Sequence, residues 1–367
     1  MSAFDDVCTE IEAAMRETDT PGIAVGLLHD GEERVEGFGV TSLENPLDVT
    51  PDTLLQIGSI TKTFTGTALM RLVERGQLDL DSPVRRYLPE LKLSDEDVAA
   101  RVTMRHLLTH TGGWIGDYFD ASGSGDDALA RIAESMSTLP QLTPLGEIWS
   151  YNNSGFYLAG RVLEVLTAMP YEQAVRELVL EPLGLEHTVF FADDVMTRRF
   201  AVGHHRNADG PPPVARPWGI GRAHHPAGGI ASTVGDLLTY ARFHMGDGGG
   251  VLKRTTLDEM QAVQLDVGSI FENVGITWAI SIRDKRRLVG HGGATNGQLA
   301  LFFFVPEEQF AFACLTNHQR GGEVNLAARA AALATLGIVE PERVPVEIDA
   351  TEYLGGFRVG GRIMSRA

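Results

Sequence analysis

The sequence predicts an α+β protein in which one antiparallel sheet, built from both termini and flanked by helices, carries an inserted, mostly helical lobe. Two observations support this fold class. Strand-like apolar runs separated by turn residues occur near both ends of the chain, whereas the middle has the pattern of helices and loops. The economical arrangement is a single sheet shared by the two ends, with a site in the cleft between sheet and lobe.

The N-terminal part begins with a predicted helix over residues 4–17, because Val7, Ile11 and Met15 repeat at four-residue spacing. Two apolar runs, 22–28 and 34–40, then flank an Asp-Gly pair, which is a strong β-hairpin signal. Near the other end four more strands are predicted, followed by an Ala-rich helix. Their ranges are 275–282, 287–291, 298–305 and 309–316 for the strands and 323–336 for the helix.

Between these ends the sequence predicts five clear helices, over residues 59–75, 104–109, 155–167, 171–178 and 234–245. We therefore expect one domain over residues 1–340. Its sheet part covers about 1–60 and 270–340, and its helical lobe covers about 61–269. Residues 341–367 are expected to form a C-terminal tail.

The composition limits the partners of this protein. Lys and Arg total 31 against 49 Asp and Glu, which gives a formal net charge of −18. Nucleic acids and anionic membranes attract clustered positive charge, so neither is expected as a partner. No apolar run approaches the ~18 residues of a membrane span. The acidic N-terminus lacks a secretory signal, so the chain as given is expected in the cytoplasm, with export left open if a leader was removed.

The clearest chemical signal is the S-x-x-K motif formed by Ser59 and Lys62. A serine hydroxyl needs a base within hydrogen-bond reach to become a nucleophile, and positions i and i+3 of a helix lie on one face. Lysine acts as a base only when desolvation or nearby positive charge lowers its pKa. The apolar residues that follow, such as Phe64 and Leu69, are expected to bury this helix. Ser59 at the helix start also gains the positive helix end, which suits an oxyanion.

Two further segments carry polar groups suited to the same reaction. Tyr151 can relay protons if a nearby cation lowers its pKa, and Asn153 can bind a substrate amide or hold the lysine. The run His291-Gly292-Gly293-Ala294 ends a predicted strand. Its glycines allow a substrate carbonyl to approach the backbone, where an N–H can complete an oxyanion hole with that of Ser59.

In order and spacing these three elements resemble the penicillin-recognising serine hydrolases. The motif Tyr151-x-Asn153 is similar to the corresponding motif of one branch of this family, which holds class C β-lactamases, family VIII esterases and D-aminopeptidase-like enzymes. The resemblance implies that Ser59 forms the acyl-enzyme, that Lys62 and Tyr151 move its proton, and that Asn153 orients the substrate. It also implies an oxyanion hole from the N–H groups of Ser59 and Ala294, and no metal or cofactor.

The third element departs from the β-lactamase pattern. True β-lactamases usually have Lys-Thr-Gly there, whose charge and hydroxyl attract the substrate carboxylate, and His291-Gly292 binds a carboxylate more weakly. This favours an esterase, or a peptidase or amidase acting on small D-amino-acid substrates. A true class C-like β-lactamase and a non-catalytic ligand-sensing homologue are the alternatives.

Other features remain secondary. His106 and His110, and the pairs at 204–205 and 224–225, suggest a metallohydrolase, but structural roles are the simpler interpretation. Residues 353–357 resemble the first strand of a C-terminal β-barrel domain that some relatives carry, so the tail is either a truncated second domain or a plain extension. The sequence carries no signal for oligomeric state.

Overall fold

In the computed structural model, which describes residues 3–120, 122–268, 271–340, 355–359 and 362–366, strands from the two ends of the chain share one sheet. Its eight strands follow the order β2-β1-β10-β9-β8-β7-β6-β5, and every neighbouring pair is antiparallel. The N-terminal hairpin therefore joins the C-terminal strands through β1 and β10, where Ile23 lies opposite Thr316. The fold class predicted from sequence is confirmed.

The strands have the following bounds: β1 Gly22–His29, β2 Glu32–Gly39, β3 Leu55–Gln56, β4 Ala231–Ser232, β5 Leu265–Asp266, β6 Asn273–Val274, β7 Ala279–Arg283, β8 Arg286–Ala294, β9 Leu299–Val305, β10 Phe310–Thr316, β11 Gly355–Val359 and β12 Arg362–Arg366. Strands β3 and β4 form one separate pair, and β11 and β12 form another.

The α-helices are α1 Ala3–Thr18, α2 Thr61–Glu74, α3 Glu96–Arg101, α4 Met104–Leu108, α5 Ala128–Ser135, α6 Ser154–Thr167, α7 Tyr171–Val175, α8 Glu181–Leu183, α9 Ala192–Val195, α10 His225–Gly228, α11 Val234–Met245, α12 Arg254–Met260 and α13 Gly321–Ala334. Short 3-10 turns are η1 Gly58–Ile60, η2 Val84–Arg86, η3 Met136–Thr138, η5 Arg222–His224 and η6 Pro306–Glu308, and a π-helical turn, η4 Arg176–Leu180, follows α7.

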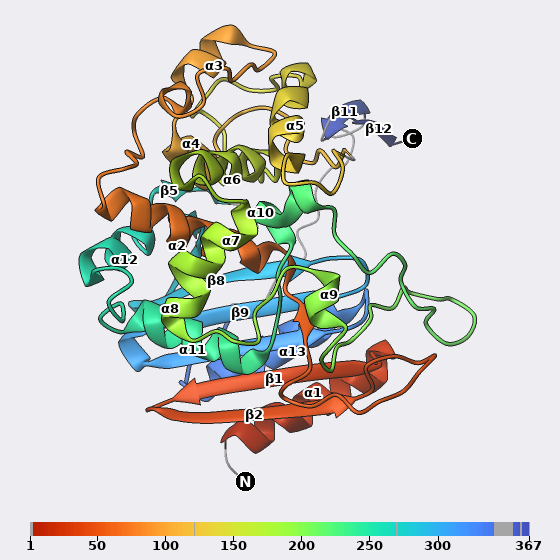
Figure 1. Ribbon diagram of the computed structural model, residues 1–367. Helices are drawn as coiled ribbons and strands as arrows, with labels where there is room; N and C mark the ends of the chain where they lie inside the picture. The colour runs from red at the N-terminus through yellow and green to blue at the C-terminus, as the bar shows by residue number, and fades with distance from the viewer. Residues whose placement is uncertain (1–2, 121, 269–270, 341–354, 360–361, 367) are drawn as a thin grey trace.

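Helices cover both faces of the sheet, because successive strand residues point to opposite sides. On β10, Phe312 and Cys314 belong to a buried cluster shared with α1 and α13, whereas Ala313 and Leu315 belong to the larger cluster shared with α2 and α11. Helices α3 to α6 gather above the sheet in Figure 1. Helix α11 lies within the segment predicted as the lobe, 61–269, yet packs on β1, β9 and β10. The exact division into sheet part and lobe stays a prediction.

Two predicted elements differ from the structure. The helix predicted over 59–75 begins only at Thr61, and Ser59 lies in the preceding 3-10 turn η1, because Gly58 has a φ of +51° and bends the chain there. The strand predicted over 275–282 is interrupted. Ile276 and Thr277 leave the ladder, and their amides donate to the carbonyls of Met260 and Leu108.

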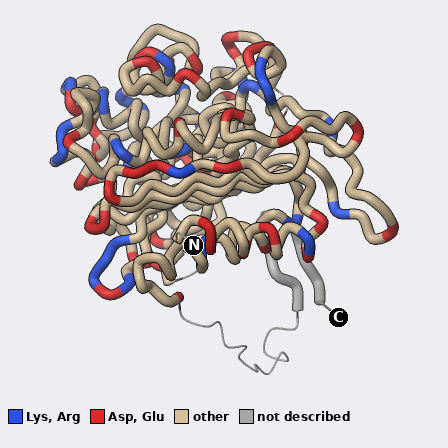
Figure 2. Tube along the Cα trace, turned by 90° about the horizontal axis from the view of Figure 1, so that it is seen from below, with Lys and Arg blue, Asp and Glu red and all other residues tan. Residues whose placement is uncertain are grey.

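Charges of both signs are interspersed around the outside of the molecule (Figure 2), so the large net negative charge is spread over the surface. Among the described residues, no helix combines the length and apolar character needed to cross a membrane. The tail predicted for 341–367 lies largely outside the described residues, apart from the β11–β12 pair.

Candidate active site

Ser59 is held at the start of α2 by a sharp turn that only glycine accommodates. Gly58 has a positive φ, and a Cβ atom placed on it would lie 2.6 Å from the amide nitrogen of Ala294. A Cβ on Gly293 would lie 1.9 Å from the carbonyl oxygen of Ile57. The turn that carries Ser59 therefore lies against the end of β8, and the two N–H groups predicted for the oxyanion hole, those of Ser59 and Ala294, belong to these adjoining segments.

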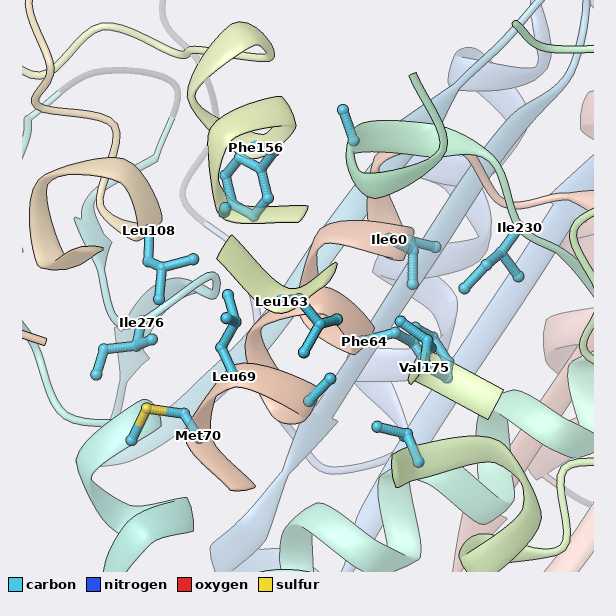
Figure 3. Close-up of a cluster of buried hydrophobic side chains, with 14 of the residues drawn as sticks. Ile60, Phe64, Leu69, Met70, Leu108, Phe156, Leu163, Val175, Ile230 and Ile276 are labelled. Carbon is cyan, nitrogen blue, oxygen red and sulfur yellow. The ribbon is translucent and has the colours of Figure 1, made fainter. Parts of the chain in front are cut away.

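Lys62 is completely buried one turn further along, in helix α2. The same helix contributes Phe64, Leu69 and Met70 to a cluster of buried apolar side chains (Figure 3). The Nζ of Lys62 lies 3.0 Å from Ser59 Oγ, 2.7 Å from Asn153 Oδ1 and 2.7 Å from the carbonyl oxygen of Ala227. Burial lowers the pKa of Lys62 well below its usual value, and the negative charge of Asp117 opposes this effect only in part. The desolvation that a lysine base requires is therefore present.

Tyr151 reaches the site from the loop before α6. Its ring stacks on His110 at 4.4 Å, and the amide of the next residue, Asn152, donates to His110 Nδ1 at 3.0 Å. The hydroxyl oxygen is buried and makes no close hydrogen bond among the described residues. Burial raises the pKa of Tyr151, an increase that the proximity of Ser59 only partly offsets. The lowered pKa considered from sequence is therefore not found, and Tyr151 is a neutral phenol that can donate a proton.

Asn153 connects Lys62 to a carboxylate. Its Oδ1 accepts from the lysine, and its Nδ2 donates to Asp117 Oδ1 at 2.8 Å. An amide so placed is oriented by both neighbours, because only its oxygen can accept from the amine and only its nitrogen can donate to the carboxylate.

Strand β8 supplies the opposite wall of the site. Ser59 and Tyr151, together with the run from His291 through Gly292 and Gly293 to Ala294, line a pocket of about 400 Å³. The remaining wall is mainly apolar and includes Phe271, Leu299, Leu301 and Leu326. All eight predicted site residues therefore come together from three separate stretches of the chain.

His291 is buried, and its Nδ1 lies 2.5 Å from the carbonyl oxygen of Gly292. Because a carbonyl only accepts, this nitrogen carries the hydrogen and Nε2 is left as an acceptor. Burial, with a smaller contribution from the nearby Lys62, lowers the pKa of His291 to about 4. The imidazole is thus neutral at physiological pH.

Two residues that touch the site, Ala227 and Asp117, were not predicted as site residues, and a third, His110, was predicted to be structural. Ala227 contributes a backbone carbonyl, which no residue type signals. Asp117 lies in the loop that follows α4, eight residues after Thr109. In the sequence this loop is marked only by its pair of glycines, which does not indicate a catalytic role for the aspartate. The structural role predicted for His110 agrees with its ring stacking on that of Tyr151.

Three of the other histidines, His106, His204 and His225, have structural partners. His106 completes a capping box with Thr103 at the start of α4, and His225 pairs with Glu172 at 2.7 Å. His204 Nε2 accepts from the amide of Leu43. Within the described part of the chain, no group of three or more His, Cys, Asp or Glu side chains is arranged to hold a metal ion.

A Ser-Lys pair in a pocket between an antiparallel sheet and a helical lobe is the arrangement of serine hydrolases that form an acyl-enzyme. Comparison with known proteins agrees. The β-lactamase family model matches residues 9–336. Penicillin-binding protein 4 of Amycolatopsis lactamdurans is 33% identical over 316 residues, which cover 83% of each chain. Esterase EstB of Burkholderia gladioli is 34% identical over 223 residues, 56% of this chain and 55% of the esterase.

A solved structure also matches nearly the whole fold. The octameric penicillin-binding protein homologue from Pyrococcus abyssi superposes with a TM-score of 0.80 at 28% identity, covering 92% of this chain and 78% of the other. The chain belongs to the β-lactamase family and is a serine hydrolase of that family.

Proposed function

We propose that this protein hydrolyses small ester or amide substrates through an acyl-enzyme on Ser59. The hydroxyl oxygen of Ser59 attacks the substrate carbonyl carbon while its proton passes to the neutral amine of Lys62. Tyr151 relays that proton to the leaving group, which departs, and water then cleaves the new ester bond to Ser59. The N–H groups of Ser59 and Ala294 stabilise the oxyanion, and Asn153 orients the substrate.

The contacts of Lys62 suit the neutral amine. A neutral amine has two N–H donors and one lone pair. Donating to Asn153 Oδ1 and to the carbonyl of Ala227 uses both hydrogens, and the lone pair then faces the Ser59 hydroxyl at 3.0 Å. This arrangement makes the lone pair available to the proton of Ser59.

Esters and small amides are favoured over β-lactams by one observation: the neutral, buried imidazole of His291. A β-lactamase attracts the substrate carboxylate with a cation at this position. His291 instead has a pKa of about 4, and its N–H donates to the carbonyl oxygen of Gly292. The nearby Arg329 does not replace that charge, since Glu340 pairs with it at 2.9 Å. The apolar pocket wall suits an uncharged substrate group.

A panel of substrates on wild type and Ser59→Ala tests the assignment. Short-chain p-nitrophenyl esters and D-amino-acid p-nitroanilides should be turned over faster than nitrocefin, and all turnover should disappear in Ser59→Ala. A fluorophosphonate probe should label Ser59 in the wild type only. Turnover that survives Ser59→Ala would exclude Ser59 as the nucleophile, and absence of both turnover and labelling would favour the ligand-sensing homologue.

The His291→Lys variant tests the substrate argument. It should raise nitrocefin turnover relative to p-nitrophenyl acetate, because a cation then faces the β-lactam carboxylate. His291→Gln, which keeps the position polar and uncharged, is the matched control, and circular dichroism together with fluorophosphonate labelling verifies that both variants are folded. An unchanged ratio in a folded, labelled His291→Lys protein would refute the argument.

A further inference from the structure

Asp117 places an exposed carboxylate at the edge of the catalytic cluster. Its Oδ1 accepts from Asn153 Nδ2 at 2.8 Å, and Asn153 in turn binds Lys62, whose amine lies 3.0 Å from Ser59 Oγ. Three consecutive hydrogen bonds thus connect the carboxylate to the nucleophile. A substrate held by Asn153 would lie against Asp117 as well.

The loop that carries Asp117 is fixed by the same segment that carries Tyr151. The carbonyl of Gly116 accepts from the amide of Ser154 at 3.0 Å, and a Cβ on Gly116 would lie 2.4 Å from the carbonyl oxygen of Tyr151. The backbone before Asp117 is therefore packed tightly against the catalytic loop. A carboxylate anchored in this way is pre-organised to act on a substrate.

The charges around Ser59 leave Asp117 electrostatically uncompensated. Within the described residues it forms no ion pair with Lys, Arg or His. Two basic groups beside Ser59 are desolvated, since burial lowers the pKa of Lys62 well below its usual value and that of His291 to about 4. Arg329, which lines the pocket, is paired with Glu340. Asp117 nevertheless acts on the site, since its charge opposes the fall in the pKa of Lys62 and adds to the rise in that of Tyr151.

We propose that Asp117 makes the site selective for substrates that carry an ammonium group close to the reacting carbonyl, as aminoacyl esters and amides with a free amine do. A substrate ammonium beside Asn153 would supply the positive charge that the protein itself does not place next to this carboxylate. The selectivity rests on the proposed acyl-enzyme function, because it concerns which carbonyl Ser59 attacks. Charge pairs near a protein surface contribute modestly, so we expect a preference of about tenfold.

Two esters of nearly equal size test the proposal. Alanine methyl ester, as both enantiomers, carries an ammonium where methyl isobutyrate carries a methyl group. Hydrolysis is followed by chromatography near pH 7 in wild type and in Asp117→Asn, which keeps an oxygen acceptor for Asn153 but removes the charge. The matched control is Asp120→Asn, which removes a charge three residues away on the same loop, where Asp120 accepts from the Tyr118 hydroxyl.

The measured quantity is the ratio of kcat/KM for alanine methyl ester to that for methyl isobutyrate. This ratio should be about tenfold higher in wild type and in Asp120→Asn than in Asp117→Asn, and the difference should decrease with added salt. The comparison between variants removes the effect of the ammonium on the intrinsic reactivity of the ester. An equal ratio in wild type and Asp117→Asn would overturn the proposal. Fluorophosphonate labelling of Ser59 distinguishes failure of the proposed acyl-enzyme function from failure of the proposed selectivity. If Ser59 is not labelled and neither ester is hydrolysed, the proposed function is contradicted. If Ser59 is labelled but the ratio does not depend on Asp117, only the role of Asp117 is contradicted.

Discussion

The amine of Lys62 donates to the main-chain carbonyl of Ala227 at 2.7 Å, across 165 positions of sequence. Ala227 belongs to the short helix α10, which is held from several sides. The carbonyl of Pro226 accepts from Thr65 at 2.8 Å, and a Cβ on Gly160 would lie only 2.3 Å from the Pro226 ring. The position of the predicted base therefore depends on how α10 is anchored.

Replacing Glu172 should disturb that anchor. Glu172 pairs with His225, the first residue of α10, and with Arg222 at 3.0 Å. Burial alone would raise the pKa of Glu172, but the hydrogen bonds from His225 and Arg222 lower it to about 2. Because the folded-state pKa lies below the unfolded value, this carboxylate stabilises the fold above about pH 4.5, by about 3 kcal/mol, and the contribution is lost as the pH falls toward 2.

We expect Glu172→Gln to lower the free energy of unfolding at pH 7 by about 3 kcal/mol and to slow fluorophosphonate labelling of Ser59 about tenfold. Urea unfolding at pH 7 and labelling rates measure the two effects. Glu177→Gln, on the neighbouring π-helical turn and hydrogen-bonded only to Gln173 among the described residues, should change neither. Wild-type stability and labelling in Glu172→Gln would show that α10 is anchored without this pair.

Asn153→Asp should shift the pH dependence of the reaction. The substitution places a carboxylate about where the amide oxygen lies 2.7 Å from Lys62 Nζ, and a nearby negative charge raises the pKa of a lysine. Since the neutral amine is the proposed base, the acidic limb of the kcat/KM profile should move up by at least about one pH unit. An acidic limb at the wild-type pH would indicate that another group controls the reaction.

Gly58→Ala should reduce both activity and stability. The added Cβ would meet the backbone of Ala294 at 2.6 Å and would require a positive φ of a non-glycine residue. We expect at least a hundredfold loss of labelling, because the oxyanion N–H groups are displaced, and a destabilisation of about 2–3 kcal/mol. Gly76→Ala is the matched control, since Gly76 also has a positive φ, +70°, but no atom within 4 Å. It should cost only about 1 kcal/mol and leave labelling intact, and equal labelling loss in both variants would contradict the explanation.

His244→Phe should stabilise the protein, most clearly in acid. The imidazole is completely buried among aromatic rings, including Tyr240 at 4.5 Å and Trp278 at 4.9 Å, and neither ring nitrogen has a hydrogen-bond partner among the described residues. Burial lowers the pKa of His244 well below its usual value. Below about pH 6.5 the unfolded chain therefore gains a proton that the folded protein does not, and stability falls.

Removing this imidazole should raise the free energy of unfolding by about 1 kcal/mol at pH 8 and by more at pH 5.5. Urea unfolding at both pH values measures the difference. The exposed His187→Gln should leave both values near wild type. A destabilisation of His244→Phe that is equal at the two pH values would instead indicate that phenylalanine packs poorly there.

The sequence by itself determined the fold class and the chemical groups of the site. Apolar runs separated by turn residues at both ends specified a sheet shared by the termini, because strands that helices cover on both faces, such as β1 and β10, are apolar almost throughout. The predicted site residues from Ser59 to Ala294 do lie together. Their catalytic roles stay predictions. The local sequence pattern was less informative where the backbone leaves regular structure. The positive φ of Gly58 delays the start of the predicted helix, and that of Thr277 interrupts the predicted strand.

Tertiary structure alone decided the electrostatics of the site. Whether Lys62 and His291 are charged depends on how completely they are buried, and burial follows from the packing of distant elements rather than from neighbours in sequence. The same holds for the carbonyl of Ala227 and the carboxylate of Asp117, which reach the lysine directly or through Asn153. The residue type does not indicate whether a backbone carbonyl will contact a catalytic group. The role of an aspartate in a loop likewise depends on the groups that the fold places beside it.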